Sequence, residues 1–251
     1  MLDPAVLEEL RAFRTRIYGC FGPRRDALFE LLDAAITSGL VPSLVHLSLD
    51  GLYRRGWGSL YAALAAGEVE VEGLRRLVAQ HPLAGGEPIY AVDTSAWPRN
   101  DAETSPERGY YHHPSRHSAG KPIVAGWCYS WLAQVGLQRT SWSAPLDVRR
   151  VPPRENLHGI AAEQVRTVVH SLAVDGPIPT FVFDAGYDPV QLVTELGNAR
   201  AAVLVRLRRD RCFYPDPEPV PRSPRGGASP TAWTQVRWRG VPRRPSQSSS
   251  A

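Results

Sequence analysis

The sequence of 251 residues has little of what several classes of protein require. Its three cysteines, Cys20, Cys128 and Cys212, are far apart and form no C-x-x-C pair, which argues against a disulfide framework and a zinc knuckle. No apolar run approaches the roughly 20 residues of a membrane helix, and the N-terminus lacks the basic start and apolar stretch of a secretory signal. We therefore expect a cytoplasmic protein without a membrane partner.

Short motifs of the commonest enzyme classes are also missing. The sequence has no G-x-S-x-G nucleophile elbow, no G-x-x-x-x-G-K phosphate loop and no G-x-G-x-x-G dinucleotide fingerprint. It does have ample apolar material, since 43% of its residues are hydrophobic and 22% are charged. That composition suits a folded chain with one sizeable core and argues against a disordered or fibrous protein.

Positive charge is concentrated at the C-terminus, although the net charge of the whole chain is only +4. In residues 207–251, nine arginines against three acidic residues give +6, which leaves −2 for residues 1–206. The same 45 residues hold eight prolines and three glycines and end in a serine-rich run. Such a composition is typical of segments that cannot bury a core, so we expect residues 207–251 to form a disordered basic tail.

The chain before this tail divides into a helical and a mixed region. From residue 4 to about residue 81, apolar residues recur at steps of three and four, which predicts helices. His81-Pro82 and Gly85-Gly86 then break the pattern, and the period changes to that of strands. We therefore predict an N-terminal helical domain at 1–84, a second domain at 85–206 and the tail at 207–251.

The second domain has the pattern of an α/β fold. Three short-linked strands would form an antiparallel meander. An amphipathic helix after Pro152-Pro153 follows, then a strand, a short helix capped by Asp188 and a last strand. The predicted class is therefore a mixed sheet of three antiparallel strands followed by helix, strand, helix and strand. The predicted strands span residues 89–92, 122–132, 138–148, 178–183 and 201–206.

Aspartates directly follow two of these strands, Asp93 after residues 89–92 and Asp184 after residues 178–183. A strand reached through a helix normally lies parallel to a neighbour, so the crossover can bring the two carboxyl ends side by side. A single aspartate after a strand is more often a turn or cap residue. Two on adjacent strands supply the hard oxygen ligands that Mg²⁺ prefers, and two such ions about 4 Å apart support phosphoryl transfer.

Three segments carry a more specific signal: YAVDTSAWPR at 90–99, GYYHH at 109–113 leading to KPIVAGW at 121–127, and FVFDAGYD at 181–188. In this order, and with these elements between them, they resemble the catalytic-core motifs of DDE-type insertion-sequence transposases of the insertion-sequence-4-like group. The resemblance spans residues 50–211. It implies a ribonuclease H-like core in which Asp93 and Asp184 are catalytic and hold Mg²⁺ or Mn²⁺.

The resemblance also implies partners and a place of action. Transposon ends and target DNA would be the substrates, a second copy of the chain would be a possible partner, and the bacterial nucleoid would be the location. The leading hypothesis is therefore a transposase that cleaves DNA strands and joins them. Two alternatives stay open, namely a non-catalytic DNA-binding transposase remnant and a metal-dependent nuclease that needs only two carboxylates.

The family's third catalytic carboxylate, a glutamate on a late helix, has no counterpart after residue 206. Glu218 is the single glutamate there, and it lies between two prolines where no helix can continue. A truncation or a frameshift would explain this, and a genuine basic arm is the alternative. We expect the chain as given to be inactive. We also expect apolar side chains within 178–183 or 201–205 to be more exposed than in a finished domain.

A polar segment between the first aspartate and the second strand is the predicted DNA-contacting loop. Its aromatic, imidazole and basic side chains could contact phosphates or stack on a base, whereas Asp101, Glu103 and Glu107 offset its charge. A mobile solvated loop and a zinc site formed by histidines are the alternatives. The candidate DNA contacts are Arg99, Arg108, Tyr110, Tyr111, His112, His113, Arg116, His117 and Lys121.

Overall fold

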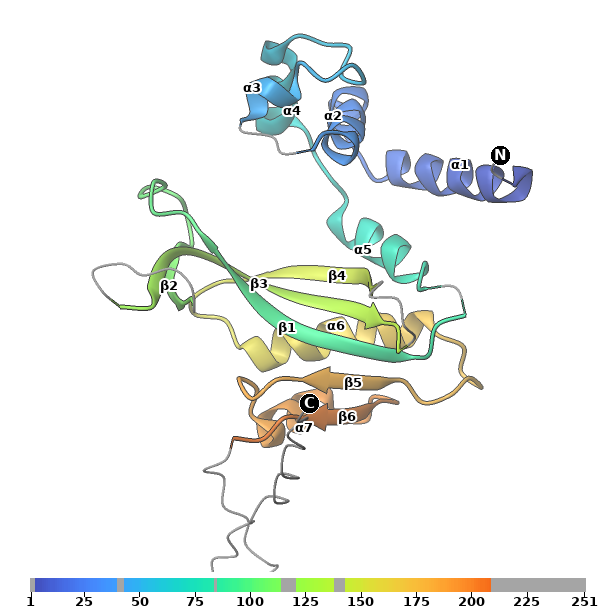
Figure 1. The fold of residues 1–251 in the computed structure, drawn as a ribbon, viewed down its shortest axis with the longest axis vertical. Helices are drawn as coiled ribbons and strands as arrows, with labels where there is room; N and C mark the ends of the chain where they lie inside the picture. Colours follow the sequence, from blue (N-terminus) through green and yellow to red (C-terminus); the bar gives the residue numbers. More distant parts are fainter. Residues whose placement is uncertain (1–2, 40–42, 84, 114–120, 138–142, 209–251) are drawn as a thin grey trace, which may run out of the picture. The chain divides into compact units, whose positions relative to one another are not determined.

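The computed structural model describes residues 3–39, 43–83, 85–113, 121–137 and 143–208 (Figure 1). Residues Met1–Val205 form one compact unit. The predicted tail lies almost entirely outside the described residues and its disorder stays a prediction, as does the division into domains 1–84 and 85–206. No helix in the described part of the chain is both long enough and apolar enough to cross a bilayer.

The N-terminal region is helical, as the apolar periodicity predicts. Asp3 caps the first helix by accepting a hydrogen bond from the backbone nitrogen of Ala5 at 2.9 Å. Two buried clusters hold the region together, one around Phe21 and Leu28 and the other around Tyr53 and Leu60. The helices are α1 (Pro4–Gly19), α2 (Arg25–Thr37), α3 (Leu44–Leu47), α4 (Trp57–Ala66) and α5 (Val71–Ala79).

The following residues form a mixed sheet, which has six strands in the described part of the chain. The strand order is β2-β3-β1-β5-β6, and β4 pairs with the stretch of β3 that β2 leaves open. Strands β1, β3 and β4 are antiparallel, whereas β1, β5 and β6 are parallel (Figure 1). The predicted α/β class with a ribonuclease H-like sheet is confirmed. The strands are β1 (Ile89–Pro98), β2 (Gly109–His112), β3 (Ile123–Val135), β4 (Ser143–Val151), β5 (Thr180–Phe183) and β6 (Ala202–Val205).

Three features of the sheet differ from the sequence-based expectation. The strand predicted at 138–148 is β4, which runs from Ser143 to Val151 in the described residues, since it pairs with β3 as far as Cys128. Strand β1 does not end at Val92 but continues to Pro98, because the long strand β3 pairs with it over its whole second half. The segment predicted as one loop contains strand β2, which pairs with the first residues of β3. Gly126 permits the close pairing of β3 with the end of β1, since a Cβ atom there would lie 2.0 Å from the backbone oxygen of Trp97.

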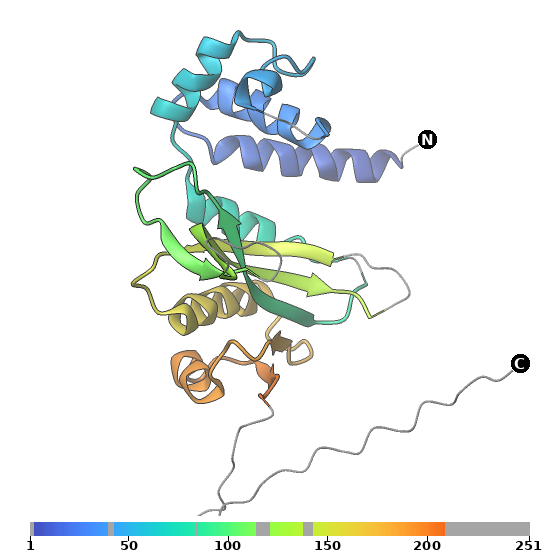
Figure 2. The same cartoon turned by 60° about the vertical axis from the view of Figure 1, so that its left-hand side comes forward.

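The main core lies between one face of the sheet and two helices, α6 (Leu157–Ser171) and α7 (Pro189–Leu196). Tyr90 and Val92 of β1 and Phe181 and Phe183 of β5 are all buried there, and Tyr90 stacks on Phe181 with ring centroids 5.0 Å apart. Helix α6 packs against β3 and β4, and Figures 1 and 2 show it beside the sheet. It is therefore the crossover that places β5 parallel to β1, as predicted.

The edge of the sheet at β6 is only partly covered. Leu204 of β6 is 59% exposed and Ile178, just before β5, is 58% exposed, whereas Phe181 and Phe183 are buried. The alternating burial along β5 and β6 means that one face packs on α6 and α7 while the other faces outward. The expected exposure is thus found for Ile178 and Leu204 and not for the phenylalanines.

Candidate active site

The parallel pairing of β1 and β5 brings the two predicted catalytic aspartates to neighbouring positions. The last paired residues are Val92 and Phe183, and Asp93 and Asp184 directly follow them. Adjacent strands in a sheet lie about 4.8 Å apart, so the two aspartates start from adjacent points of the backbone. Val92 and Phe183 are buried while both aspartates are exposed.

Each carboxylate is oriented by a backbone hydrogen bond to its own segment. Oδ1 of Asp93 accepts from the nitrogen of Thr94 at 2.7 Å, and Oδ1 of Asp184 accepts from the nitrogen of Gly186 at 2.8 Å. The second bond closes a tight turn, in which a Cβ atom at position 186 would lie 2.9 Å from Oδ1 of Asp184. Within the described ranges, no ion pair involves either aspartate, so their remaining oxygen lone pairs are available for a ligand.

Tyr187 is a neighbour that both aspartates share. Its side chain is buried between the rings of Phe183 and His158, at centroid distances of 5.0 and 5.9 Å. Burial raises the pKa of the Tyr187 phenol strongly, and the negative charges of Asp93 and Asp184 raise it further. The nearby Ser130 hydroxyl lowers the pKa of the Tyr187 phenol, although the two hydroxyls do not meet the geometry of a hydrogen bond. One buried phenol therefore experiences the charge of both carboxylates.

The residues present fit a hard divalent cation in part. Two exposed carboxylates without a cationic partner are oxygen ligands of the kind that Mg²⁺ and Mn²⁺ take, and both ions keep further positions for water or phosphate. Across the part of the chain that the structure describes, however, no group of three or more acidic, histidine or cysteine side chains is arranged so that it could hold a metal ion. Asp93 and Asp184 are thus a pair, and the third carboxylate of the resemblance is not among the described residues.

The chain that carries this fold and these two aspartates matches a known protein family. A family model described as DDE superfamily endonuclease matches residues 16–245. The chain belongs to this family. Among curated proteins, none matches the sequence closely enough to count as a relative. The family acts on DNA and generally uses divalent metal ions, so the expected substrate and the expected class of cofactor are supported at that level.

The exposed part of the predicted DNA-contacting segment of this DDE endonuclease is smaller than the sequence indicates. Tyr110 is 78% exposed, and His112 and Lys121 are exposed too. Tyr111, on the same short strand, is half-buried, and its hydroxyl donates to the backbone oxygen of Val151 at 3.4 Å. Alternation along β2 explains the difference. Three side chains of the predicted set therefore face solvent beside β3.

Two arginines of the predicted set make contacts within the DDE endonuclease itself. The Arg99 guanidinium pairs with Asp101 at 3.1 Å and lies 5.5 Å from the ring centroid of Trp127. Arg108 donates to the backbone oxygens of Arg99 and Asn100, each at 3.2 Å. These contacts hold residues 99–108 in place. The two guanidinium groups therefore stabilise the local structure, in addition to any contact that they make with DNA.

The remaining members of that set can be placed only in part. The backbone nitrogen of His113 donates to the oxygen of Pro122 at 2.9 Å, which fastens the end of β2 to the start of β3. Arg116 and His117 lie outside the described residues. The alternative zinc site at His112, His113 and His117 therefore stays a prediction, because His117 lies outside the described residues.

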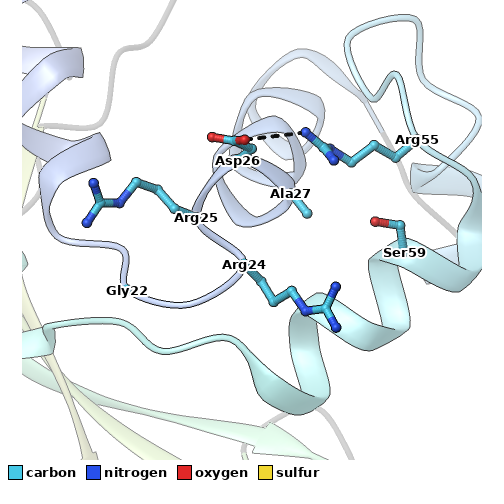
Figure 3. A pocket seen from close by; sticks show the side chains of 7 residues that line it. All are labelled: Gly22, Arg24, Arg25, Asp26, Ala27, Arg55 and Ser59. Carbon is cyan, nitrogen blue, oxygen red and sulfur yellow. Dashed lines mark ion pairs between the residues drawn. The ribbon is translucent and has the colours of Figure 1, made fainter.

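A cavity in the helical region of the DDE endonuclease was not anticipated from the sequence. It has a volume of about 380 Å³ and lies at the start of α2 (Figure 3). Arg55 pairs with Asp26 at 3.7 Å and with Glu30 at 3.2 Å, and Arg25 donates to the oxygen of Phe21. Of the three arginines that line the cavity, Arg55 is thus paired with acidic side chains. Its lining residues are Gly22, Arg24, Arg25, Asp26, Ala27, Arg55 and Ser59.

Proposed function

We propose that this DDE endonuclease is an insertion-sequence transposase chain of the insertion-sequence-4-like group, in which Asp93 and Asp184 are the catalytic carboxylates. The observation that supports it most is the parallel β1–β5 pair, which ends at Val92 and Phe183 and so sets the two aspartates side by side. Transposon ends and target DNA would be the substrates, and the bacterial nucleoid the location. A second copy of the chain is the possible further partner.

The two aspartates would hold Mg²⁺ or Mn²⁺ through their exposed oxygens. Bound there, the metal would make an attacking water or hydroxyl more acidic and offset the negative charge of the phosphate. Backbone hydrogen bonds from Thr94 and Gly186 fix one oxygen of each aspartate and leave the other for a ligand. We expect the two carboxyl groups to lie within about 4 to 7 Å of each other, the spacing at which they can share ions.

We further propose that the chain as given cleaves DNA poorly or not at all. The reason is that no third acidic side chain joins Asp93 and Asp184 among the described residues. A two-carboxylate metal-dependent nuclease and a non-catalytic DNA-binding remnant are the functions that compete with this proposal. Metal binding and strand cleavage must therefore be measured separately.

The first experiment measures Mn²⁺ binding to the full chain by calorimetry. We expect Asp93→Asn and Asp184→Asn each to weaken binding at least about tenfold, because each removes a charged ligand of a shared ion. Asp101→Asn is the matched control, since Asp101 is an exposed aspartate that pairs with Arg99. Equal Mn²⁺ affinity in all four proteins would refute the shared metal site.

The second experiment follows nicking of supercoiled plasmid with Mg²⁺ or Mn²⁺ and separates the three functions. Nicking that both aspartate variants abolish, without joining of strands, would identify a two-carboxylate nuclease. Binding of DNA without nicking would identify either the inactive transposase or the remnant, and the Mn²⁺ result then distinguishes them. Strand joining by the unmodified chain would contradict the proposed inactivity.

Non-specific DNA affinity is expected to come mainly from the arginine-rich tail, most of which lies outside the described residues. Each phosphate that is neutralised adds about −0.9 to the slope of log affinity against log salt concentration. Deletion of residues 207–251 should therefore weaken binding to random duplex and flatten that slope. An unchanged slope after the deletion would place the binding surface in the folded part, where Tyr110, His112 and Lys121 are exposed.

A further inference from the structure

The turn that carries Asp184 is anchored at both of its ends. Its first end continues from β5, whose last residue, Phe183, is buried and pairs with β1. Its other end is the start of α7, where Asp188 caps the helix by accepting from the backbone nitrogens of Val190 and Gln191. The carboxylate of Asp184 lies between these two anchors. Whatever holds Asp188 in place therefore also limits where Asp184 can move.

His158, in the first turn of α6, holds the second of these ends. The backbone nitrogen of Asp188 donates to Nε2 of His158 at 2.9 Å. A backbone nitrogen can only donate, so Nε2 is the ring nitrogen without a proton. Because Asp188 is the cap residue of α7, its backbone nitrogen lies outside the hydrogen bonds of that helix. His158 thus supplies an acceptor from a part of the chain that lies 30 residues earlier.

The ring of His158 also packs on Tyr187, which lies between the two ends of the turn. The two rings meet edge to face, with centroids 5.9 Å apart and planes at 90°. Tyr187 is 3% exposed, and its backbone nitrogen donates to the backbone oxygen of Asp184 at 3.4 Å. One imidazole therefore contacts two successive residues of the turn, and the first of them is hydrogen-bonded to Asp184 itself.

Other contacts fix the start of α6 and join this helix to α7. Asn156 caps α6 by accepting from the backbone nitrogen of His158 at 3.1 Å, and its side chain donates to Oε1 of Glu195 on α7 at 2.7 Å. Arg166 donates to the backbone oxygen of Glu195, also at 2.7 Å. The attachment of α7 to α6 thus does not depend on His158 alone. Loss of the His158 acceptor should loosen the turn and leave the two helices in place.

We propose that His158 is a positioning residue for Asp184, because its Nε2 acceptor and its ring hold the turn in the conformation in which that carboxylate takes a metal ion. Asp93 needs no such partner, since its backbone lies inside the ladder between β1 and β3. Groups that orient metal ligands typically contribute about ten- to hundredfold to metal affinity. The inference rests on the proposed function, because it takes Asp184 as a metal ligand.

The test measures Mn²⁺ affinity of the full chain by calorimetry, in variants that separate the acceptor from the ring. His158→Phe keeps a flat ring beside Tyr187 but has no acceptor. We expect it to weaken binding about tenfold, the lower end of that range, because His158 acts on Asp184 through the turn. His158→Gln should retain most of the affinity, since its Oε1 can reach the place of Nε2. His170→Phe is the matched control, because His170 is an exposed histidine at the other end of α6.

A second pair of variants keeps the test valid if His158→Phe does not fold. His158→Asn is polar like His158→Gln, but its oxygen matches the position of Nδ1 and does not reach that of Nε2. We expect His158→Asn to weaken Mn²⁺ binding as His158→Phe does. Equal Mn²⁺ affinity in the Gln and Asn variants would show that no acceptor is needed at the place of Nε2 and would overturn the proposal.

Hydrogen exchange of the backbone amides reports on the turn without any metal. Loss of one hydrogen bond should speed exchange at Asp188 about tenfold in His158→Phe and His158→Asn. Exchange at Asp188 should stay slow in His158→Gln, and the amides of β5 should not change in any variant. Exchange at Asp188 that is the same in all these proteins would overturn the proposal.

The outcomes also separate this inference from the metal site on which it rests. If Asp184→Asn weakens Mn²⁺ binding and His158→Phe does not, the metal site stands and the positioning role is wrong. If neither variant weakens it, Asp184 is not a ligand and both proposals fail, whatever the exchange at Asp188 shows. Weaker binding in both variants, with affinity retained in His158→Gln, would support the two together.

Discussion

The carboxylate of Asp147 is the buried charge on which the attachment of α5 to the sheet depends. Its side chain is 0% exposed, and it lies at a bulge where the register between β3 and β4 shifts. Nε of Arg75, from α5, lies 3.2 Å from one oxygen, and Nε of Arg149, from β4, lies 3.0 Å from the other. Glu72 and Glu163 extend the network from α5 and α6.

Removal of the Asp147 carboxylate should destabilise the fold, because Arg75 and Arg149 would both lose their shared ion-pair partner. Breaking a buried ion pair by deleting one partner typically costs about 3 to 5 kcal/mol. Arg75 and Arg149 are 22% and 15% exposed and keep their glutamate partners, so we expect the lower end of that range. Asp147→Ala should therefore lower the free energy of unfolding by about 3 kcal/mol, which corresponds to a fall in Tm of about 6 to 12 °C.

Urea denaturation followed by far-UV circular dichroism measures this loss, with an unchanged m-value as evidence for a pure change in stability. Glu8→Ala is the matched control, because Glu8 pairs with Arg11 at a site where both side chains are more than half exposed. That substitution should cost less than about 1 kcal/mol. If Asp147→Ala lowers the free energy of unfolding no more than the control does, the cost of desolvating the carboxylate cancels its pairing energy. That result would refute the stabilising role of Asp147.

Three further outcomes follow from the sheet and its helices. Gly126→Ala should destabilise the protein by about 1 to 3 kcal/mol, since its Cβ would lie 2.0 Å from a backbone oxygen. Gly58→Ala should instead stabilise the protein, because Gly58 has open space around it in α4. Thermal unfolding of the two variants measures both effects. Ser130→Ala should cost about 1 to 3 kcal/mol in urea denaturation, because it leaves Gln164 without its buried 2.6 Å partner. Burial raises the pKa of the Tyr90 phenol above its usual value of 10. The neutral phenol therefore stabilises the folded protein below pH 10, and this contribution is lost as the pH rises through the raised pKa. Tyr90→Phe should therefore reduce the fall in unfolding free energy at alkaline pH.

The periodicity of apolar residues predicted the order of the elements other than strand β2 in the second domain. Alternation and short apolar runs located the strands, and a stripe at three- and four-residue steps located α6, because these patterns reflect which face of an element is buried. Asp188 caps α7 as predicted, accepting from the backbone nitrogens of Val190 and Gln191. The crossover rule for parallel strands predicted that β5 is parallel to a neighbour, and the hypothesis that this neighbour is β1 is confirmed. That pairing is what makes Asp93 and Asp184 neighbours.

Local patterns could not predict contacts that depend on distant residues. Strand β2 was missed because Gly109 and the tyrosines after it are flanked by polar residues, and only pairing with β3 makes them a strand. The network around Asp147 joins α5 to β4 across more than 70 residues of sequence, and nothing near Asp147 in the chain indicates that it is buried.

The two candidate catalytic aspartates differ in how firmly the fold holds them. Asp93 lies inside β1, and its backbone is paired with Trp131 in β3 on one side, so its position is fixed by a ladder that continues beyond it in both directions. Asp184 follows the last residue of β5 and is held by the turn to Gly186. A substitution in that turn should therefore move Asp184 and leave Asp93 in place. Gly186→Ala, whose Cβ would press on Oδ1 of Asp184, should accordingly weaken Mn²⁺ binding while the protein stays folded, and unchanged binding would mean that Asp184 does not act as a ligand through this turn.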